Sequence, residues 1–280
     1  MAIKLEYIMN RIDTLPALPT SALRVLQMTK NPETTVKELH NAIALDPSLA
    51  ASILRQANSA YYGYARRIST LTDAIIILGF QTIQGLAMAA AVSPMLKKQV
   101  LGYNIDQEGL WQHSMLTAMM AMRLSKRLKK PFADTAFTVG LLHDIGKLVL
   151  SVYVQEVGHF MLESIEEQQI SYSELEEKVI GFDHAVVGGF ICQRWNLPEE
   201  IAEPVTFHHK PGESKNFREM TSVVHIANCL AQSLGLGDSA DSFLNPLDPD
   251  TLELFGLSET DLDSLIAETS ELISDPHVFS

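Results

Sequence analysis

The sequence predicts an all-α protein, and three kinds of observation support this prediction. Helix-start signals are frequent: 35–38 (TVKE) and 171–174 (SYSE) are capping boxes, and Asp46-Pro47 puts a capping side chain before a first-turn proline. Apolar residues recur at helical spacing, for example Leu49, Ile53, Leu54 and Ala57. Sustained period-two alternation, which is typical of strands, is almost absent.

The first third of the chain is expected to hold several short helices. One follows the capping box at Thr35, and a second runs from Pro47 to Asn58, after which 58–63 (NSAYYG) is typical of a loop. Two apolar helices, 71–78 and 82–92, are expected on either side of Gly79. The apolar run 74–96 is interrupted by polar residues and Pro94, so we interpret it as buried helices and not as a membrane span.

A second group of helices is expected after residue 104. A long helix is marked by Trp111, three methionines and Leu124, and it ends in the basic cluster 123–130 before Pro131. The next predicted helix is 132–150, with a continuation through 149–154 that is rich in β-branched residues. Further helices are expected to open at Ser171, Asp183 and Leu197-Pro198, and a final core helix covers 217–233.

These elements suggest three segments: an N-terminal helical subdomain over 1–98, a helical domain over 99–235 and an acidic segment over 236–280. From Gly235 to Ser280 there are eleven acidic residues and no Lys or Arg. The pattern that follows Ser258 predicts a small amphipathic helix with a solvated acidic face. We favour a helical cap over a docking site for a basic partner, and we expect that deletion of 240–280 leaves the remainder folded.

Composition limits the classes of partner. The net charge is −13 and the pI is near 5.1, which disfavours nucleic acid and anionic membranes because both require a basic face. The apolar content of 46% is sufficient for a folded core. Cys192 and Cys229 lie in apolar helical patterns and favour buried thiols over a disulfide. Met1 is followed by a charged segment and not by a signal peptide, so we expect a cytoplasmic protein.

The stretch 139–150 (VGLLHDIGKLVL) places His143 and Asp144 within an apolar segment. Unpaired buried polar groups cost a few kcal/mol each, about 1–3, so this pair requires partners. Five of the nine histidines occur in apolar helical contexts: His113, His143, His184, His208 and His209. They either share one polar site with Asp144 or are unrelated core residues. The others stand singly, which favours a surface or satisfied core role: His40, His159, His225 and His277.

Together these motifs resemble the HD superfamily, and more closely the HDOD family of bacterial signalling proteins. The resemblance extends from about residue 15 to 235. It is carried by 15–19 (LPALP), 46–49 (DPSL), 57–60 (ANSA), Leu78-Gly79, 141–147 (LLHDIGK) and the segment 183–188. It implies a multi-helix HD-like bundle with an extra N-terminal helical subdomain.

The resemblance also implies a ligand set for a metal. His113 takes the first ligand position and His143-Asp144 the doublet, while His184, His208 and His209 match the extra positions of two-metal HD-GYP enzymes. Asp144 would bridge two ions. Asn228 stands where the family pattern closes with Asp, which keeps an oxygen donor but removes a negative charge and makes this a weak ligand. The Gly-Tyr-Pro that follows the histidines in HD-GYP enzymes is absent after His209.

Two functions follow. The first is a non-catalytic signalling module that acts through protein or ligand binding, with a vestigial or regulatory metal site, and whose N-terminal half binds a protein partner or a second copy. The second is a metal-dependent phosphohydrolase for a nucleotide or other phosphorylated small molecule, in which one or two Fe, Mn or Mg ions activate a water. Fe or Mn is favoured over Zn because the donors include no Cys. Lys147 would neutralise a phosphate oxygen beside catalytic Asp144, or would simply reach solvent. A metal bound without turnover lies between the two, and the oligomeric state is left open.

Overall fold

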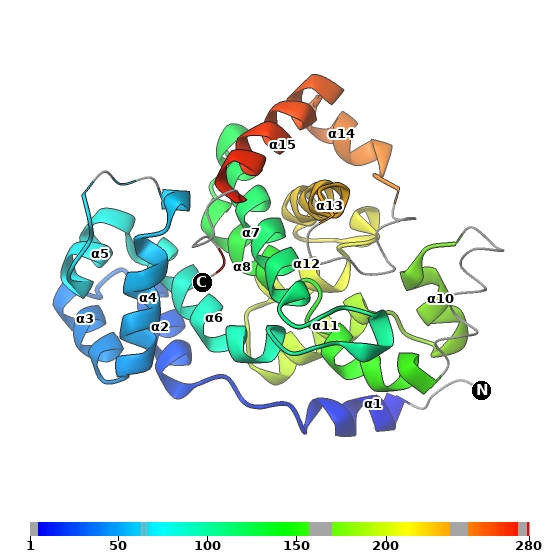
Figure 1. The fold of residues 1–280 in the computed structure, drawn as a ribbon, viewed down its shortest axis with the longest axis horizontal. Helices are drawn as coiled ribbons and strands as arrows, with labels where there is room; N and C mark the ends of the chain where they lie inside the picture. Colours follow the sequence, from blue (N-terminus) through cyan, green and yellow to red (C-terminus); the bar gives the residue numbers. More distant parts are fainter. Residues whose placement is uncertain are drawn as a thin grey trace. The chain divides into compact units, whose positions relative to one another are not determined.

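The computed structural model describes residues 5–62, 64, 66–156, 170–235, 246–273 and 279, and confirms the all-α prediction. Within these residues the only extended pairing is a single bridge between Val100 and Ile105. His159 and His277 lie outside the described residues, so their predicted roles are not addressed. Figure 1 shows the helices in chain order.

The chain divides into two compact units. The large unit comprises Met1–Pro16 and Met95–Ile266, and the small unit comprises Ala17–Pro94 and Ala267–Ser280. Two of the three boundaries between the units fall inside helices, since α6 (Phe80–Leu96) and α15 (Glu259–Ile273) each contribute residues to both units. Each unit is described by itself below.

The small unit is built from short helices around an aliphatic core. Its helices are α2 (Thr20–Lys30), α3 (Val36–Ala44), α4 (Pro47–Ala57), the 3-10 turn η1 (Ala60–Tyr62), α5 (Leu71–Leu78) and most of α6. Thr35 and Glu38 form the predicted capping box, and the Asp46 side chain accepts from the amides of Ser48 and Leu49. The core includes Val25, Leu39, Ile43, Ile53, Ile75 and Leu86, all almost fully buried.

The contacts of Asn58 explain why an Asn follows the last residue of α4. Its side-chain amide donates to the carbonyls of Leu54 and Ile68, at 2.6 and 2.8 Å, and its side-chain oxygen accepts from the Ile68 amide at 2.8 Å. One side chain therefore provides hydrogen-bond partners for a backbone carbonyl at the end of α4 and for both backbone groups of Ile68 in the following loop.

The large unit contains the other helices. They are α1 (Leu5–Ile12), η2 (Leu101–Tyr103), α7 (Gly109–Arg127), α8 (Ala133–Leu142), a helix at 147–156, α10 (Tyr172–Val179), α11 (His184–Arg194), α12 (Glu199–Thr206), η3 (Pro211–Glu213), α13 (Arg218–Ser233), α14 (Pro249–Phe255) and α15. Helix α7 is its centre: it packs against α8 and α13, and fifteen of its residues are buried (Figure 1). This burial accounts for the many apolar residues of α7, whose charged side chains lie near its C-terminal end.

One stretch of the described residues, Ala133–Glu156, has the length and apolar character that a bilayer span requires. Of its most apolar window, 78% is buried inside the protein. This degree of burial is typical of a core helix. It is consistent with the soluble protein expected from the sequence, whereas the cytoplasmic location stays a prediction.

The predicted single helix over 132–150 is wrong in one respect. Helix α8 ends at Leu142, and 143–146 form a tight turn before helix begins again at Lys147. The His143 ring explains the interruption, because its Nδ1 donates to the Gly140 carbonyl at 2.6 Å, the acceptor that the Asp144 amide would use in a continuous helix. The following amides bond three residues back, as Lys147 does to Asp144 at 3.0 Å.

The acidic segment forms α14 and α15 in the described residues, and its acidic side is solvated as predicted. Glu253, Glu259 and Asp263 are exposed, whereas Leu262 and Leu265 are buried. The segment is tied to α7 by the ion pair of Arg127 with Asp261, at 3.1 Å. No disulfide joins Cys192, which is buried, to Cys229, which is half-buried. The effect of deleting 240–280 stays a prediction.

Candidate metal centre

Asp144 lies at the centre of the polar cluster that the sequence predicted. Its Oδ2 is 3.4 Å from His143 Nε2 and 3.6 Å from His113 Nε2. Its Oδ1 is 3.1 Å from His184 Nε2 and 3.9 Å from His208 Nε2. The two carboxylate oxygens therefore face two different groups of imidazoles, which is the arrangement of a bridging carboxylate.

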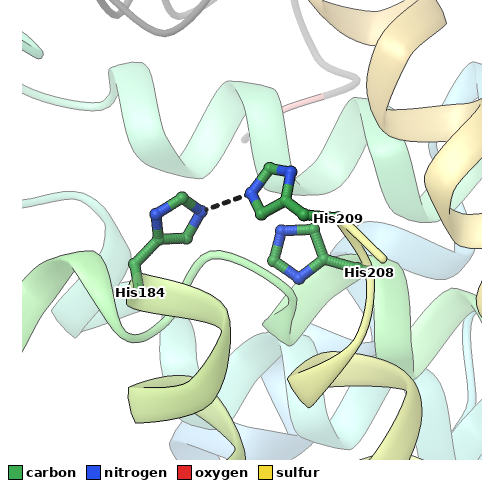
Figure 2. A group of neighbouring side chains, drawn as sticks. All are labelled: His184, His208 and His209. Atoms are coloured by element: carbon green, nitrogen blue, oxygen red, sulfur yellow. Dashed lines mark hydrogen bonds between the residues drawn. The ribbon is translucent and has the colours of Figure 1, made fainter. Parts of the chain in front are cut away.

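The second group is completed by His209. Figure 2 shows His184 reaching from the start of α11 toward the two histidines in the turn after α12. His209 Nε2 lies 2.8 Å from His184 Nε2, and the ligand atoms of His184, His208 and His209 all lie within 4.8 Å of one another. His113, His143 and Asp144 form a similar group. Residues that are remote in the sequence thus converge, as predicted.

Hydrogen bonds on the far side of three rings fix which nitrogen faces Asp144. The Nδ1 atoms of His143 and His208 lie 2.6 and 2.8 Å from the carbonyls of Gly140 and Val205. A carbonyl can only accept, so each Nδ1 carries the hydrogen and the Nε2 lone pair points into the cluster. His184 Nδ1 likewise donates to Glu176 Oε2 at 2.8 Å. Metal-ligating histidines are held in this way in proteins.

Within the described part of the chain, several buried polar atoms of this cluster lack a hydrogen-bond partner: His143 Nε2, His208 Nε2 and Asp144 Oδ1. His143 and His208 are fully buried, and Asp144 is 1% exposed. Each such atom costs about 1–3 kcal/mol. Divalent cations bind such atoms, and imidazole nitrogens together with a carboxylate suit Mn or Fe. The residues therefore fit a metal ion.

The two groups are not equally prepared for an ion. On the His113 side, the Asn228 side-chain oxygen accepts from His113 Nε2 at 2.9 Å, so this nitrogen is engaged. Lys147 Nζ lies 2.8 Å from Asp144 Oδ2 on the same side and already supplies a positive charge. The group of His184, His208 and His209 contains His208 Nε2, which has no hydrogen-bond partner among the described residues, and a 2.8 Å contact between the Nε2 atoms of His184 and His209.

Lys147 does not reach solvent, so that alternative is wrong. Its side chain is 1% exposed, and its ammonium also lies 5.6 Å from the Tyr103 ring centroid. Burial alone would raise the pKa of Asp144, but the neighbouring imidazoles and the Lys147 ammonium hold it well below its usual range. The carboxylate is therefore ionised, as a metal ligand must be.

The sequence did not reveal Glu176, a fully buried carboxylate in α10. Besides its contact with the His184 ring, it accepts from the His184 backbone amide at 2.7 Å and from the Tyr103 hydroxyl. Burial would lower the pKa of His184, but Glu176 and Asp144 outweigh this and raise it to about 10. His184 therefore holds a second proton, on Nε2, which faces His209 Nε2 at 2.8 Å.

Burial keeps two of the other imidazoles, those of His113 and His208, in the neutral form. Burial lowers the pKa of His113 to about 4. Burial and the neighbouring imidazoles of His143 and His184 bring the pKa of His208 well below its usual range. Neutral imidazole is the metal-binding form, so these rings need no deprotonation to bind an ion.

Two glycines allow the helices to approach closely enough to form the cluster. A Cβ on Gly146 would lie 2.0 Å from the His184 carbonyl oxygen, so a glycine is needed where the doublet turn meets α11. A Cβ on Gly140 would lie 2.8 Å from the Ala118 Cα, where α8 meets α7. Gly146 thus brings Asp144 next to His184.

The family model for the HDOD domain matches residues 15–211, which is well over half of the chain. The chain belongs to the HDOD family. This agrees with the signatures between residues 15 and 188. The HDOD domain ends, in this match, just after His208 and His209, so it contains every predicted ligand except Asn228.

Solved structures with the same fold include three bacterial proteins. An HDOD domain protein of unknown function from Geobacter sulfurreducens has a TM-score of 0.74 and 24% identity, with 97% of this chain and 96% of that chain covered. A protein from Shewanella amazonensis SB2B, provisionally named a phosphohydrolase, has a TM-score of 0.72 and 24% identity, with coverage of 98% and 96%. A protein from Marinobacter aquaeolei VT8, provisionally named a signal transduction protein, has a TM-score of 0.74 and 22% identity, with coverage of 96% and 64%.

A curated relative of unknown function from Treponema pallidum (strain Nichols) is 26% identical over 223 residues. The match covers 79% of this chain but only 43% of the relative, so this chain spans less than half of that protein's length. At these identities the solved structures show a shared fold. The names of the relatives describe those proteins alone.

Proposed function

We propose that this HDOD domain is a signalling module that binds one divalent cation, Mn or Fe, in a buried regulatory centre. The preferred position is the space faced by His184, His208, His209 and Asp144 Oδ1. The observation that carries the proposal is the set of buried polar atoms without partners around Asp144. The Nδ1 atoms of His143 and His208 donate to backbone carbonyls, which leaves their Nε2 atoms available to an ion.

Burial of the centre favours binding over turnover. His143, His184 and His208 are fully buried, and His113 is 6% exposed. A catalytic metal site keeps an open position for substrate, whereas a structural or sensing site is closed. The absence of a carboxylate at Asn228 also removes a ligand that a second ion would need. A closed site transmits binding through the positions of the helices that supply its ligands.

A metal-dependent phosphohydrolase that acts on a nucleotide or other phosphorylated small molecule is the second candidate. Its specific support is Lys147, a buried cation beside Asp144. When bound, the ion would supply an activated water and charge for phosphate oxygens. Lys147 would then bind a phosphate oxygen, and Asp144 would be a ligand of the ion.

The small unit is proposed to carry the surface for a protein partner or a second copy. Ile76 and Ile77 on α5 are 64% and 45% exposed, and clustered exposed aliphatic side chains are typical of interaction surfaces. Ile76→Asp and Ile77→Asp should leave thermal stability unchanged and abolish concentration-dependent association in sedimentation. Leu45→Asp, at an exposed position after α3, is the matched control.

Elemental analysis tests the central proposal. The purified chain, reconstituted with Mn²⁺ or anaerobically with Fe²⁺, should retain about one ion per chain and unfold at a higher temperature. His208→Ala should lose the ion, while His40→Ala, on α3, should retain it. Far less than one ion after reconstitution contradicts the proposal. Steady phosphate release from nucleotides, abolished by Asp144→Ala, would establish the phosphohydrolase instead.

A further inference from the structure

His225 is a buried histidine that the proposed ligand set does not use. It lies on α13, and it is 3% exposed. Its Nδ1 donates to the backbone carbonyl of His208 at 2.9 Å, and its Nε2 accepts from the backbone amide of Asp248 at 3.0 Å. A carbonyl only accepts and an amide only donates, so a single neutral tautomer satisfies both bonds.

The two partners of His225 belong to different parts of the large unit. The His208 carbonyl lies in the turn that carries His208 and His209, next to the candidate centre. The Asp248 amide lies in the acidic segment at the N-cap of α14, which the Asp248 side chain caps by accepting from the Asp250 amide at 2.9 Å. His225 is thus a bridge of one side chain between the ligand turn and the start of α14.

We infer that His225 is a positioning residue that couples the ligand turn to the acidic segment, so that binding of a cation by the centre and docking of α14 stabilise each other. The inference rests on the proposed function for its cation. Both bonds end on backbone atoms, so a shift of the turn displaces the imidazole and changes its bond to Asp248. Coupling between two sites is reciprocal, so docking of α14 must strengthen cation binding by the factor by which the cation stabilises docking.

The backbone at Asp248 offers a matched pair of variants. Its φ of −66° is the value that proline adopts, so Asp248→Pro removes the N–H that bonds to His225 without forcing a new φ. It also removes the capping carboxylate. Asp248→Ala removes that carboxylate but keeps the N–H, so the difference between the two variants reports the bond to His225.

The experiment measures Mn²⁺ affinity by titration, and amide hydrogen exchange over 205–211 and 246–255 by mass spectrometry, in the full chain. Relative to Asp248→Ala, Asp248→Pro should weaken Mn²⁺ binding by about fivefold or more, the usual lower range of such coupling. Mn²⁺ should slow exchange over 246–255 in the wild-type chain and in Asp248→Ala, but not in Asp248→Pro. His225→Phe, which removes both bonds, should also abolish this protection.

Equal Mn²⁺ affinities for Asp248→Pro and Asp248→Ala, with equal protection of 246–255, would overturn the inference. If the wild-type chain binds no Mn²⁺ or Fe²⁺, the proposed function fails. Amide hydrogen exchange in the metal-free chain then tests whether His225 couples the ligand turn to α14. Faster exchange over 205–211 in Asp248→Pro than in Asp248→Ala would then support the bridge, and identical exchange would overturn it.

Discussion

Glu176 holds His184 by two bonds from one carboxylate oxygen, which lies 2.8 Å from the ring Nδ1 and 2.7 Å from the backbone amide. This oxygen therefore fixes both the ring and the first residue of α11. The same contact favours the imidazolium, whose pKa is raised to about 10. Because a ligand must lose this proton, an ion and a proton compete for His184.

The first prediction concerns that competition. Below pH 10, each unit of pH increase should raise Mn²⁺ affinity about tenfold, since one proton leaves as the ion binds. Glu176→Gln removes the charge, so the pKa of His184 should fall toward its ordinary value near 6.5. Above about pH 7.5, affinity in this variant should become much less dependent on pH. Titrations at several pH values measure both slopes.

Glu177→Gln is the matched control for this experiment. Glu177 is the next residue of α10, and its carboxylate pairs with Lys210 near the surface. Its removal should leave the steep pH dependence intact. Identical pH slopes in the wild-type chain and Glu176→Gln would contradict the role given to Glu176.

The second prediction restores the missing carboxylate. Asn228 Oδ1 lies 2.9 Å from His113 Nε2, so Asn228→Asp places a charged oxygen beside the group of His113, His143 and Asp144. A carboxylate favours a hard cation where an amide does not. Metal content after reconstitution should rise from about one ion per chain toward two. Asn41→Asp, at an exposed position on α3, should not change the metal content. An unchanged metal content in Asn228→Asp would contradict a second ion position beside His113.

The third prediction concerns Gly146. The Cβ of Gly146→Ala would lie 2.0 Å from a backbone oxygen of His184, which cannot move without shifting α11. Overpacking of this kind costs about 1–3 kcal/mol or more. Thermal unfolding should show a clear loss of stability, and metal retention should fall because the doublet moves away from His184. Gly212→Ala, where a Cβ meets nothing within 4 Å, should behave as wild type. Equal melting temperatures would refute the close approach.

The fourth prediction concerns Glu203 in α12. Its carboxylate accepts from the Ser214 hydroxyl and the Asn216 amide, both at 2.7 Å, and so holds the loop after the ligand turn. Burial would raise the pKa of Glu203, but these hydrogen bonds outweigh it and lower the pKa to about 2. The folded pKa lies below the unfolded value of 4.5, so this stability is present above pH 4.5 and is lost as pH falls toward 2.

Glu203→Gln should therefore destabilise the chain by about 2 kcal/mol at neutral pH and weaken the decline in stability between pH 4.5 and 2. Denaturant unfolding at a series of pH values measures this. Glu213→Gln, an exposed glutamate in the same loop, should leave both unchanged. If the stability of Glu203→Gln fell with pH as steeply as that of the wild-type chain, this carboxylate would not be the source of the acid sensitivity.

Local sequence was sufficient wherever neighbouring residues decide the structure. The capping boxes at Thr35 and Ser171 and the cap at Asp183 are each made by contacts within three residues, so their pattern is visible in the chain. The histidines of the centre were also recognisable, because buried imidazoles in apolar helices require a reason. Their grouping around Asp144 was correctly predicted from that requirement and from the family pattern.

Glu176 could not be distinguished in this way. It stands among Glu174 and Glu177, and only its burial against His184 and Tyr103, from distant elements, separates it from its solvated neighbours. The end of α8 was missed for a similar reason. The His143 ring donates to the Gly140 carbonyl in place of the Asp144 amide, and such a replacement leaves no periodic signal in the sequence.

The sequence by itself determined the all-helical class, the helix starts and the residue types that could bind a cation, since these depend on local propensity and on the cost of burying polar groups. Only the tertiary structure decided that Asp144 turns one oxygen to each group of histidines, that Lys147 is buried beside it, and that His225 joins the ligand turn to Asp248. These depend on close approach between helices distant in the chain, which the packing of the whole unit sets.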